Sequence, residues 1–368
     1  MKRTETLKEQ EILAVDAVRK LLENVPSIQV ESVEYAHAIA TNLQIDGRIG
    51  FRHGGISHQL IVEVKSDGAP RSVRSGVFQL KGYVSHLHQS RNSVRGERWI
   101  PILASTYLSP RSRAICSDCG VAYLDLVGNA YLAFGDVYIE RAVADQPKSE
   151  ARALRSIFTP KASAVLRTML RDPDRPWRVV DLAEKAQTSL GHVSNVRKAL
   201  LSREFIEEQD EGVVLSKPAM LLTAWRENYR QLRGHHTKEY TRFHGRQLDE
   251  RLRGKLNPYR NGPRAIYAVD SAAGWLAPFA RDGTHVFYTD EAGTQVLQEV
   301  LELSPTAVGP NVVLCEPFDD GLFDDAVEPS PGIFCTSPLV TYLDLWNGND
   351  RQREAATHLA EECFPWLQ

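Results

Sequence analysis

The sequence of 368 residues contains no apolar run that approaches the roughly 20 residues that a membrane-spanning helix needs. Residues 1–6 are polar and lack the apolar core of a secretory signal peptide. Cysteine is scarce, with five residues in an odd, widely spaced set that is typical of reduced thiols and not of a disulfide scaffold. These absences exclude membrane-embedded and disulfide-stapled secreted proteins, and they predict a cytoplasmic protein with no membrane partner.

A second C-x-x-C pair is also missing. Cys116 and Cys119 have the spacing of half a zinc site, but no other pair exists to complete a set of four sulfur ligands. We therefore favour two partly buried thiols over a zinc or redox site.

Composition and length predict a globular protein with more than one domain. Apolar residues make up 42% and charged residues 25% of the chain, and its length suits roughly two to three domains. Residues 160–203 carry nine Lys and Arg against four Asp and Glu, and residues 301–368 carry two against twelve. This basic centre and acidic end favour a nucleic-acid face and a separate face that does not bind DNA, although surface charge varies along any chain.

The most informative pattern combines two carboxylates with a lysine. Residues 60–65 alternate as a strand does, so Glu63 and Lys65 share one face. Asp46 ends the preceding strand-like run, residues 43–46. Two adjacent strands can bring Asp46 and Glu63 together as hard oxygen ligands for Mg²⁺, with Lys65 beside the attacking water or the phosphate. Asp followed by Glu-x-Lys also occurs by chance.

A helix then carries Gln79 and Tyr83, which lie one turn apart and face the same way. The periodicity predicts the order helix, three strands, helix and strand, at about 6–23, 28–38, 43–51, 58–66, 73–89 and 99–104.

These residues and this order resemble the PD-(D/E)XK nuclease superfamily, in the branch that has a Q-x-x-x-Y helix, over about the first 140 residues. The resemblance implies a restriction-endonuclease-like α/β fold in which Asp46 and Glu63 bind Mg²⁺ or Mn²⁺ and Lys65 is the catalytic lysine. Gln79 and Tyr83 would support the catalytic site on the substrate side.

The family often adds a glutamate from the first helix, and Glu11 is the candidate. Ile45 stands where the motif has its proline, and Gly47 follows Asp46. Folds of this type also serve as inert binding modules, so an active Mg²⁺-dependent DNA endonuclease and a binding module both remain open. Asp125 precedes a Gly-Asn turn and is expected to stabilise that turn in preference to binding a metal.

A polar segment, residues 144–158, is expected to link to a second domain. Helices are predicted at about 160–170, 180–186 and 190–201, followed by two short strands joined by a polar turn at 205–215. This pattern is similar to the winged helix-turn-helix class, in which the third helix lies in the DNA major groove.

On that third helix, Val193, Val196 and Leu200 should face inward. The side chains expected to face outward are Ser189, His192, Ser194, Asn195, Arg197 and Lys198. Asn195 suits an adenine edge, whereas Arg197 and Lys198 suit guanine or phosphate. Arg203 and Arg175 are further phosphate candidates. The alternative is a winged helix that contacts protein.

The last third begins with a predicted long, arginine-rich helix near Ala219, on which His235, His236 and His244 would be exposed. Residues 317–325 are predicted to form a solvated acidic loop. The pieces at 270–273, 337–345 and 353–356 resemble the C-terminal region of AbiEi-like antitoxins and regulators of type IV toxin–antitoxin systems. The resemblance implies a protein that represses its own promoter and counters a nucleotidyltransferase-like toxin.

The sequence thus predicts an α/β multidomain protein with a nuclease-like domain at 1–145, a winged helix-turn-helix domain at 156–217 and an α/β domain at 218–368. Its main predicted function is DNA-binding transcriptional regulation, with double-stranded DNA and a toxin protein as partners. The alternative is a Mg²⁺-dependent endonuclease directed to DNA by the winged helix. A third interpretation is an interaction protein whose acidic end neutralises a toxin without DNA.

Overall fold

The computed structural model describes residues 2–40, 43–89, 98–144, 147–231, 233–279, 283–305 and 309–367. The chain divides into two compact units: unit 1 comprises Met1–Ala153 and Leu201–Glu204, and unit 2 comprises Leu154–Leu200 and Phe205–Gln368. The predicted middle and C-terminal segments therefore belong largely to one unit. None of the described helices is both long and apolar enough to cross a membrane.

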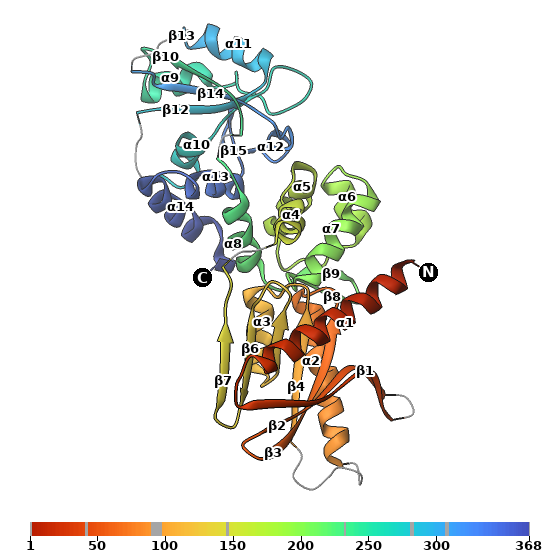
Figure 1. The fold of residues 1–368 in the computed structure, drawn as a ribbon. Helices are drawn as coiled ribbons and strands as arrows, with labels where there is room; N and C mark the ends of the chain where they lie inside the picture. Colours follow the sequence, from red (N-terminus) through yellow and green to blue (C-terminus); the bar gives the residue numbers. More distant parts are fainter. Residues whose placement is uncertain are drawn as a thin grey trace. The chain divides into compact units, whose positions relative to one another are not determined.

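Unit 1 is built on a seven-stranded sheet in the order of the sequence (Figure 1). Its strands are β1 (Ile28–Ala40), β2 (Leu43–His53), β3 (Ile56–Lys65), β4 (Arg98–Ser105), β5 (Ala122–Asp125), β6 (Ala130–Phe134) and β7 (Val137–Arg141). The pairs β3–β4 and β4–β5 are parallel, and the other neighbouring strands are antiparallel. The helices are α1 (Lys2–Glu23), α2 (Pro70–Gln89) and α3 (Pro110–Asp118). The predicted order of the first six elements is confirmed.

The helices cover opposite faces of this sheet. Leu60 and Val62 of β3 pack in the cluster that includes α1, whereas Ile61 packs in the cluster that includes α2 and α3. Because side chains alternate along a strand, Glu63 and Lys65 lie on the same face as Ile61, toward α2. Gly47 lets α1 approach β2, since a Cβ atom at this position would lie 2.6 Å from Val15 Cγ2.

Unit 2 begins with helices followed by a hairpin. Its first elements are α5 (Pro160–Arg171), α6 (Val179–Lys185), α7 (Leu190–Ser202), β8 (Ile206–Gln209) and β9 (Gly212–Leu215). They match the three predicted helices and the two predicted strands in type and position. The expected linker is different, because α4 (Lys148–Ser156) occupies most of it.

The rest of unit 2 holds a second seven-stranded sheet, in the order β13-β10-β14-β12-β11-β16-β15. The strands are β10 (Gly234–Tyr240), β11 (Ala265–Tyr267), β12 (His285–Thr289), β13 (Ser304–Pro305), β14 (Val312–Pro317), β15 (Val327–Ser330) and β16 (Ile333–Cys335). The helices are α8 (Pro218–Asn228), α9 (Gly245–Leu252), α10 (Val269–Leu276), α11 (Glu291–Val300), α12 (Gly321–Asp324), α13 (Pro338–Trp346), α14 (Asp350–Cys363) and the 3₁₀ turn η1 (Pro365–Leu367).

The prediction of one long arginine-rich helix from Ala219 is wrong. Helix α8 ends at Asn228, and exposed His235 and His236 lie on strand β10. His244 immediately precedes α9. Pairing of β10 with the distant strand β14 outweighs the local helix propensity of this segment.

Candidate active site and candidate nucleic-acid interface

Asp46 and Glu63 meet where strands β2 and β3 separate. The backbone pairing of these strands ends at Gly47 and Val62. Beyond this pair, the Val64 amide donates to Asp46 Oδ2 at 2.6 Å, so a carboxylate takes the place of a backbone carbonyl. The two predicted metal ligands therefore come from adjacent strands at one point of the sheet.

Lys65 is held between Glu63 and helix α2. Its Nζ donates to Glu63 Oε1 at 2.7 Å and to Gln79 Oε1 at 2.5 Å. Gly76 provides space for this side chain, because a Cβ atom there would lie 2.9 Å from Lys65 Cε and 2.7 Å from Leu103 Cδ1. The structure thus brings Lys65, Glu63 and Gln79 together.

Negative charge dominates this cluster. Burial is the main cause that raises the pKa of Asp46, and it is opposed by the Val64 amide and by Lys65. Burial also raises the pKa of Glu63, with Lys65 opposing and Asp46 and Glu11 adding to the shift. The pKa of Tyr83 is raised first by burial and then by Glu63 and Asp46. Tyr83 and the candidate Glu11 are therefore both within electrostatic range of the two carboxylates.

The donor chemistry fits a hard divalent cation. No group of three or more His, Cys, Asp or Glu side chains in the described ranges is arranged to hold a metal ion. Two partly desolvated carboxylates that repel each other are nevertheless suited to Mg²⁺, which commonly takes one or two protein carboxylates and keeps several waters. Asp46 and Glu63 would supply those two ligands.

Two neighbouring features have structural roles. Asp125 is buried, and its Oδ1 accepts from the amides of Val127, Gly128 and Asn129, which confirms the predicted turn-stabilising acid. Cys116 is a buried free thiol whose pKa burial raises to about 12.

The third helix of the predicted winged helix-turn-helix segment is α7. Val193, Val196 and Leu200 are buried, as predicted. The remaining candidates divide by exposure: Ser189, Asn195 and Lys198 are exposed, whereas His192, Ser194 and Arg197 are half-buried. Ser189 Oγ also accepts from the His192 amide at 3.3 Å.

Arg197 has an internal partner that the sequence reasoning missed. Its guanidinium is paired with Glu208 on β8. The hairpin also exposes Glu207, Asp210 and Glu211, so its tip would repel a phosphate backbone. The four acidic residues within 207–211 were the feature of the sequence from which this acidic hairpin could have been predicted.

The two outlying phosphate candidates differ in exposure. Arg203 is half-buried, donates to Ser202 Oγ at 3.4 Å and has a pKa that burial lowers. Arg175 is exposed and lies over the Trp177 ring at 4.1 Å.

The acidic segment at 317–325 is not the predicted solvated loop, because arginines hold it. Asp319 Oδ2 lies 3.3 Å from Arg167 Nη1, and Asp325 pairs with Arg171. On the other side, Asp324 pairs with Arg260 and Asp320 with Arg264. Arg167 is only 4% exposed, so part of this ion-pair cluster is buried.

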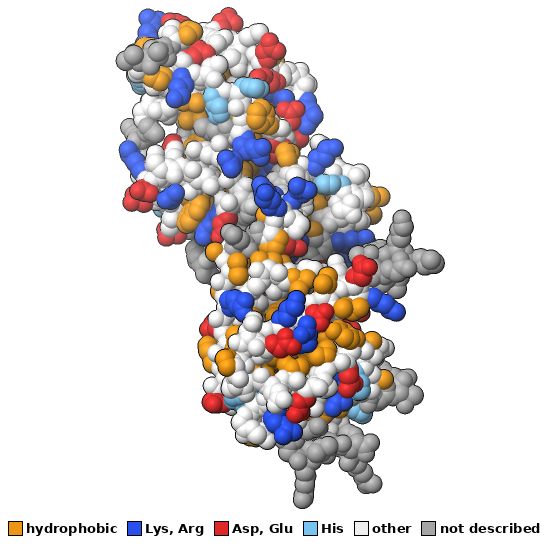
Figure 2. Space-filling model, viewed as in Figure 1, with side chains coloured by type: hydrophobic (Ala, Val, Ile, Leu, Met, Phe, Trp, Pro, Cys, Tyr) orange, Lys and Arg blue, Asp and Glu red, His pale blue; other side chains and the backbone are white. Residues whose placement is uncertain are grey.

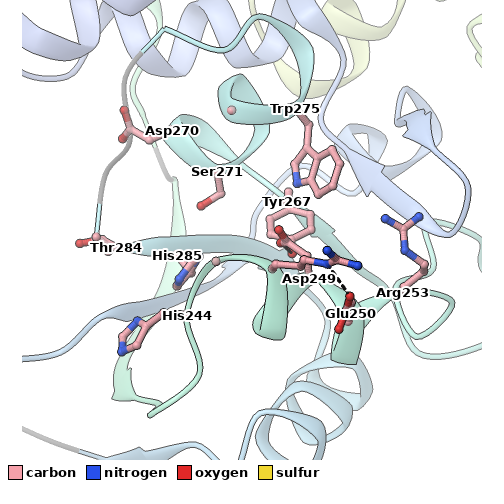
Figure 3. Close-up of a pocket in the computed structure, with 14 residues that line it drawn as sticks. His244, Asp249, Glu250, Arg253, Tyr267, Asp270, Ser271, Trp275, Thr284 and His285 are labelled. Atoms are coloured by element: carbon pink, nitrogen blue, oxygen red, sulfur yellow. Dashed lines mark hydrogen bonds and ion pairs between the residues drawn. The ribbon is translucent and has the colours of Figure 1, made fainter.

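A polar cavity of about 920 Å³ lies beside α9 and α10 (Figure 3). On one side of the view, Tyr267 donates to Asp249 Oδ1 at 2.7 Å, and its ring lies 6.3 Å from that of Trp275. Arg246 and Glu250 pair with each other at 2.7 Å. The labelled side chains on the other side are His244, Asp270, Ser271, Thr284 and His285. The Asp249 carboxylate and the Arg246–Glu250 pair thus already have protein partners.

Comparisons with known proteins agree with part of the expectation. The family described as "Transcriptional regulator, AbiEi antitoxin, Type IV TA system" matches residues 214–365. A solved structure titled "Structure of EndoMS in apo form" matches at 20% identity, covering 31% of this chain and 45% of that chain, with a TM-score of 0.21. The match therefore spans less than half of that protein. No curated protein matches the sequence.

Proposed function

We propose that this protein is a DNA-binding regulator of the type IV toxin–antitoxin kind, with the 160–215 segment acting as a winged helix-turn-helix. The observation that carries this proposal is the match of residues 214–365 to a family of transcriptional regulators and antitoxins. The segment immediately before that region has the element order of a winged helix and exposes polar residues on α7. A protein toxin is the partner that the family description implies.

In this arrangement α7 enters the major groove. Exposed Asn195 hydrogen-bonds an adenine edge, and exposed Lys198 contacts a phosphate or guanine. Arg197 joins them only when Glu208 releases it. The acidic hairpin tip stays away from the DNA backbone, which distinguishes this docking from one in which the wing contacts phosphate.

The test is binding of the full chain to DNA from its own promoter region, measured over a range of salt concentrations. Asn195→Ala should weaken specific binding by about 1–3 kcal/mol. Lys198→Ala should weaken binding to all sequences and reduce the salt slope by about one. Lys255→Ala, which removes an exposed lysine elsewhere in unit 2, is the matched control. Equal effects of all three variants would refute the α7 assignment.

The cluster around Asp46 favours a second function, Mg²⁺-dependent DNA cleavage. Asp46 and Glu63 would hold the ion, which when bound supplies Lewis-acid activation of the phosphate and of a water. Lys65, fixed by Gln79, would stabilise negative charge that develops on the phosphate. Lys65 is hydrogen-bonded to both Glu63 and Gln79, and Asp46 is close enough to Lys65 and Glu63 to interact with their charges.

Cleavage is tested by incubating DNA with Mg²⁺ or Mn²⁺ and the native chain, Asp46→Ala or Lys65→Ala. Lys81→Ala, an exposed lysine on the same helix as Gln79, controls for loss of positive charge. Cleavage that is lost in the first two variants and kept in the control supports the enzyme. Binding without cleavage in every sample supports the regulator alone.

A further inference from the structure

A small cavity of about 120 Å³ lies within unit 2, between helix α5 and the C-terminal sheet region. One wall comes from Phe158, Ser163 and Arg167, which belong to α5 and the residues before it. The opposite wall comes from α8, β12 and α13. A ligand here would therefore touch both the helical segment proposed to bind DNA and the region that matches the antitoxin family.

Positive charge exceeds negative charge around this cavity. Its charged lining residues are three arginines, Arg167, Arg230 and Arg233, and one acid, Asp319. Arg167 is buried and already bonded to Asp319 and to Ser163 Oγ. Arg230 and Arg233 are exposed, and their guanidinium groups have no hydrogen-bond or ion-pair partner among the residues that the structure describes. In the space-filling view, Lys and Arg side chains gather over the part of unit 2 that holds α5 and α12 (Figure 2).

This surplus distinguishes the small cavity from the larger one beside α9, where Arg246 and Glu250 neutralise each other. Guanidinium groups without a protein partner are the side chains best suited to bind a carboxylate, because their donors match its two oxygens. The cavity therefore favours an anion.

Apolar side chains, several of them aromatic, make up much of the remaining lining, beside the polar groups of Ser163, Asn228, Tyr229 and Tyr288. The rings of Phe158 and Trp225 are stacked at 6.0 Å with an interplanar angle of 18°. Phe318, which is 62% exposed, lines the same cavity, and Val340 and Leu343 form buried parts of it. An apolar cavity of about 150 Å³ takes a benzene ring, and the space here, about 120 Å³ with the exposed Phe318 at its wall, is close to that of a single ring.

From the unpartnered arginines and the aromatic walls, we infer that this cavity binds a small aromatic carboxylate. The ring lies against Phe158 and Trp225, and the carboxylate is held by Arg230 and Arg233. Its charge also competes with Asp319 for Arg167, so binding loosens the contact between α5 and the acidic segment. Occupancy thereby changes the DNA affinity of the 160–215 segment, a coupling that rests on the proposed function, whereas ligand binding does not.

Calorimetric titration of benzoate into the full chain tests the site. We expect saturable binding at one site that weakens at least about tenfold in the Arg230→Ala/Arg233→Ala double variant. The fold should survive, because both side chains are exposed and unpartnered, and circular dichroism checks this. Lys238→Ala, an exposed lysine on β10, should bind benzoate as the native chain does.

Two further probes separate the ring from the charge. Benzyl alcohol lacks the carboxylate and inorganic phosphate lacks the ring, so each should bind at least about tenfold more weakly than benzoate. Absence of saturable benzoate binding, equal binding by the double variant, or phosphate binding as tight as benzoate would overturn the site. Benzoate binding by a chain that shows no DNA affinity would instead reject the proposed function and leave the site intact. Benzoate that binds without changing a measurable DNA affinity would overturn the coupling.

Discussion

The two units contain contrasting clusters of buried charge. In unit 1, Asp46 and Glu63 face one lysine, and burial raises the pKa of both carboxylates. In unit 2, Arg167 and Arg171 of α5 face Asp319 and Asp325, so the charges balance. An unbalanced cluster is destabilising by itself and is relieved by an external cation, whereas a balanced one fastens two segments together. The unbalanced cluster of unit 1 is therefore the candidate site, whereas the balanced cluster of unit 2, called the clamp below, holds α5 to the acidic segment.

The largest expected effect tests the clamp. Arg167→Ala removes the buried arginine of the balanced cluster and leaves Asp319 and the buried Asp325 short of a partner, which should lower the free energy of unfolding by about 3–5 kcal/mol. Arg171→Ala, on the same helix but 64% exposed at the side chain, should lower it by less than about 1 kcal/mol. Urea unfolding followed by fluorescence measures both. Similar losses for the two variants would remove the distinction between clamp and surface pair.

The second prediction asks whether the unbalanced cluster depends on the position of its lysine. Gly76→Ala places a Cβ atom against Lys65 Cε and should displace the amine, with overpacking worth about 1–3 kcal/mol and a helix-propensity gain of about 1 kcal/mol opposing it. We expect cleavage or metal binding to fall while unfolding temperature changes little. Gly82→Ala lies on the same helix with no atom within 4 Å of its Cβ, so it should stabilise the chain and leave the site unaffected. A site equally disturbed by both changes would contradict this geometry.

The third prediction concerns the repulsion in unit 1. Asp46→Asn removes one charge but keeps an oxygen for the Val64 amide, so it should stabilise the metal-free chain by roughly 0.5–2 kcal/mol at neutral pH. Because the pKa of Asp46 is higher in the folded than in the unfolded chain, the native chain loses stability as pH rises from the unfolded pKa to the folded pKa, and the gain from Asp46→Asn should disappear in acid. Thermal unfolding across pH measures this difference.

Adding Mn²⁺ gives a second comparison of the native chain with Asp46→Asn. It should raise the unfolding temperature of the native chain, because it binds the folded state, and should have little effect on Asp46→Asn. Asp16→Asn, an α1 carboxylate bonded to Tyr35, should retain the Mn²⁺ response. A response shared by all three proteins would place the ion elsewhere.

The smallest effect concerns the exposed pair between α7 and the hairpin. Glu208→Gln should free Arg197 and strengthen DNA binding by less than about 1 kcal/mol, or several-fold. Glu207→Gln removes an equal charge from the same strand without a bond to Arg197, so it isolates the general electrostatic contribution. Fluorescence anisotropy with labelled DNA measures both. A weaker complex with Glu208→Gln would show that the pair positions Arg197 for binding.

Local patterns were sufficient for the elements that carry the candidate site. Period-two alternation at 60–65 placed Glu63 and Lys65 on one face, and a one-turn spacing placed Gln79 and Tyr83 on one side of a helix. The buried faces of α7 followed in the same way from Val193, Val196 and Leu200.

Long-range contacts account for what the sequence did not predict. Strand β10 exists because it pairs with β14, far along the chain, and the acidic segment is ordered by arginines that include Arg167, 152 residues away from Asp319. Glu208 likewise captures Arg197 across a turn. Each of these partners is chosen by tertiary packing, which composition and periodicity within one segment do not encode.

The amide of Val64 provides a built-in reporter for unit 1. Most strand amides are protected by a neighbouring carbonyl, but this one is bonded to Asp46 Oδ2 at 2.6 Å. Its proton resonance should therefore shift when that carboxylate takes up a proton or an ion, while amides nearby on β3 stay still. A single backbone signal in a nuclear magnetic resonance spectrum would then follow the state of the acidic cluster without any change to the sequence.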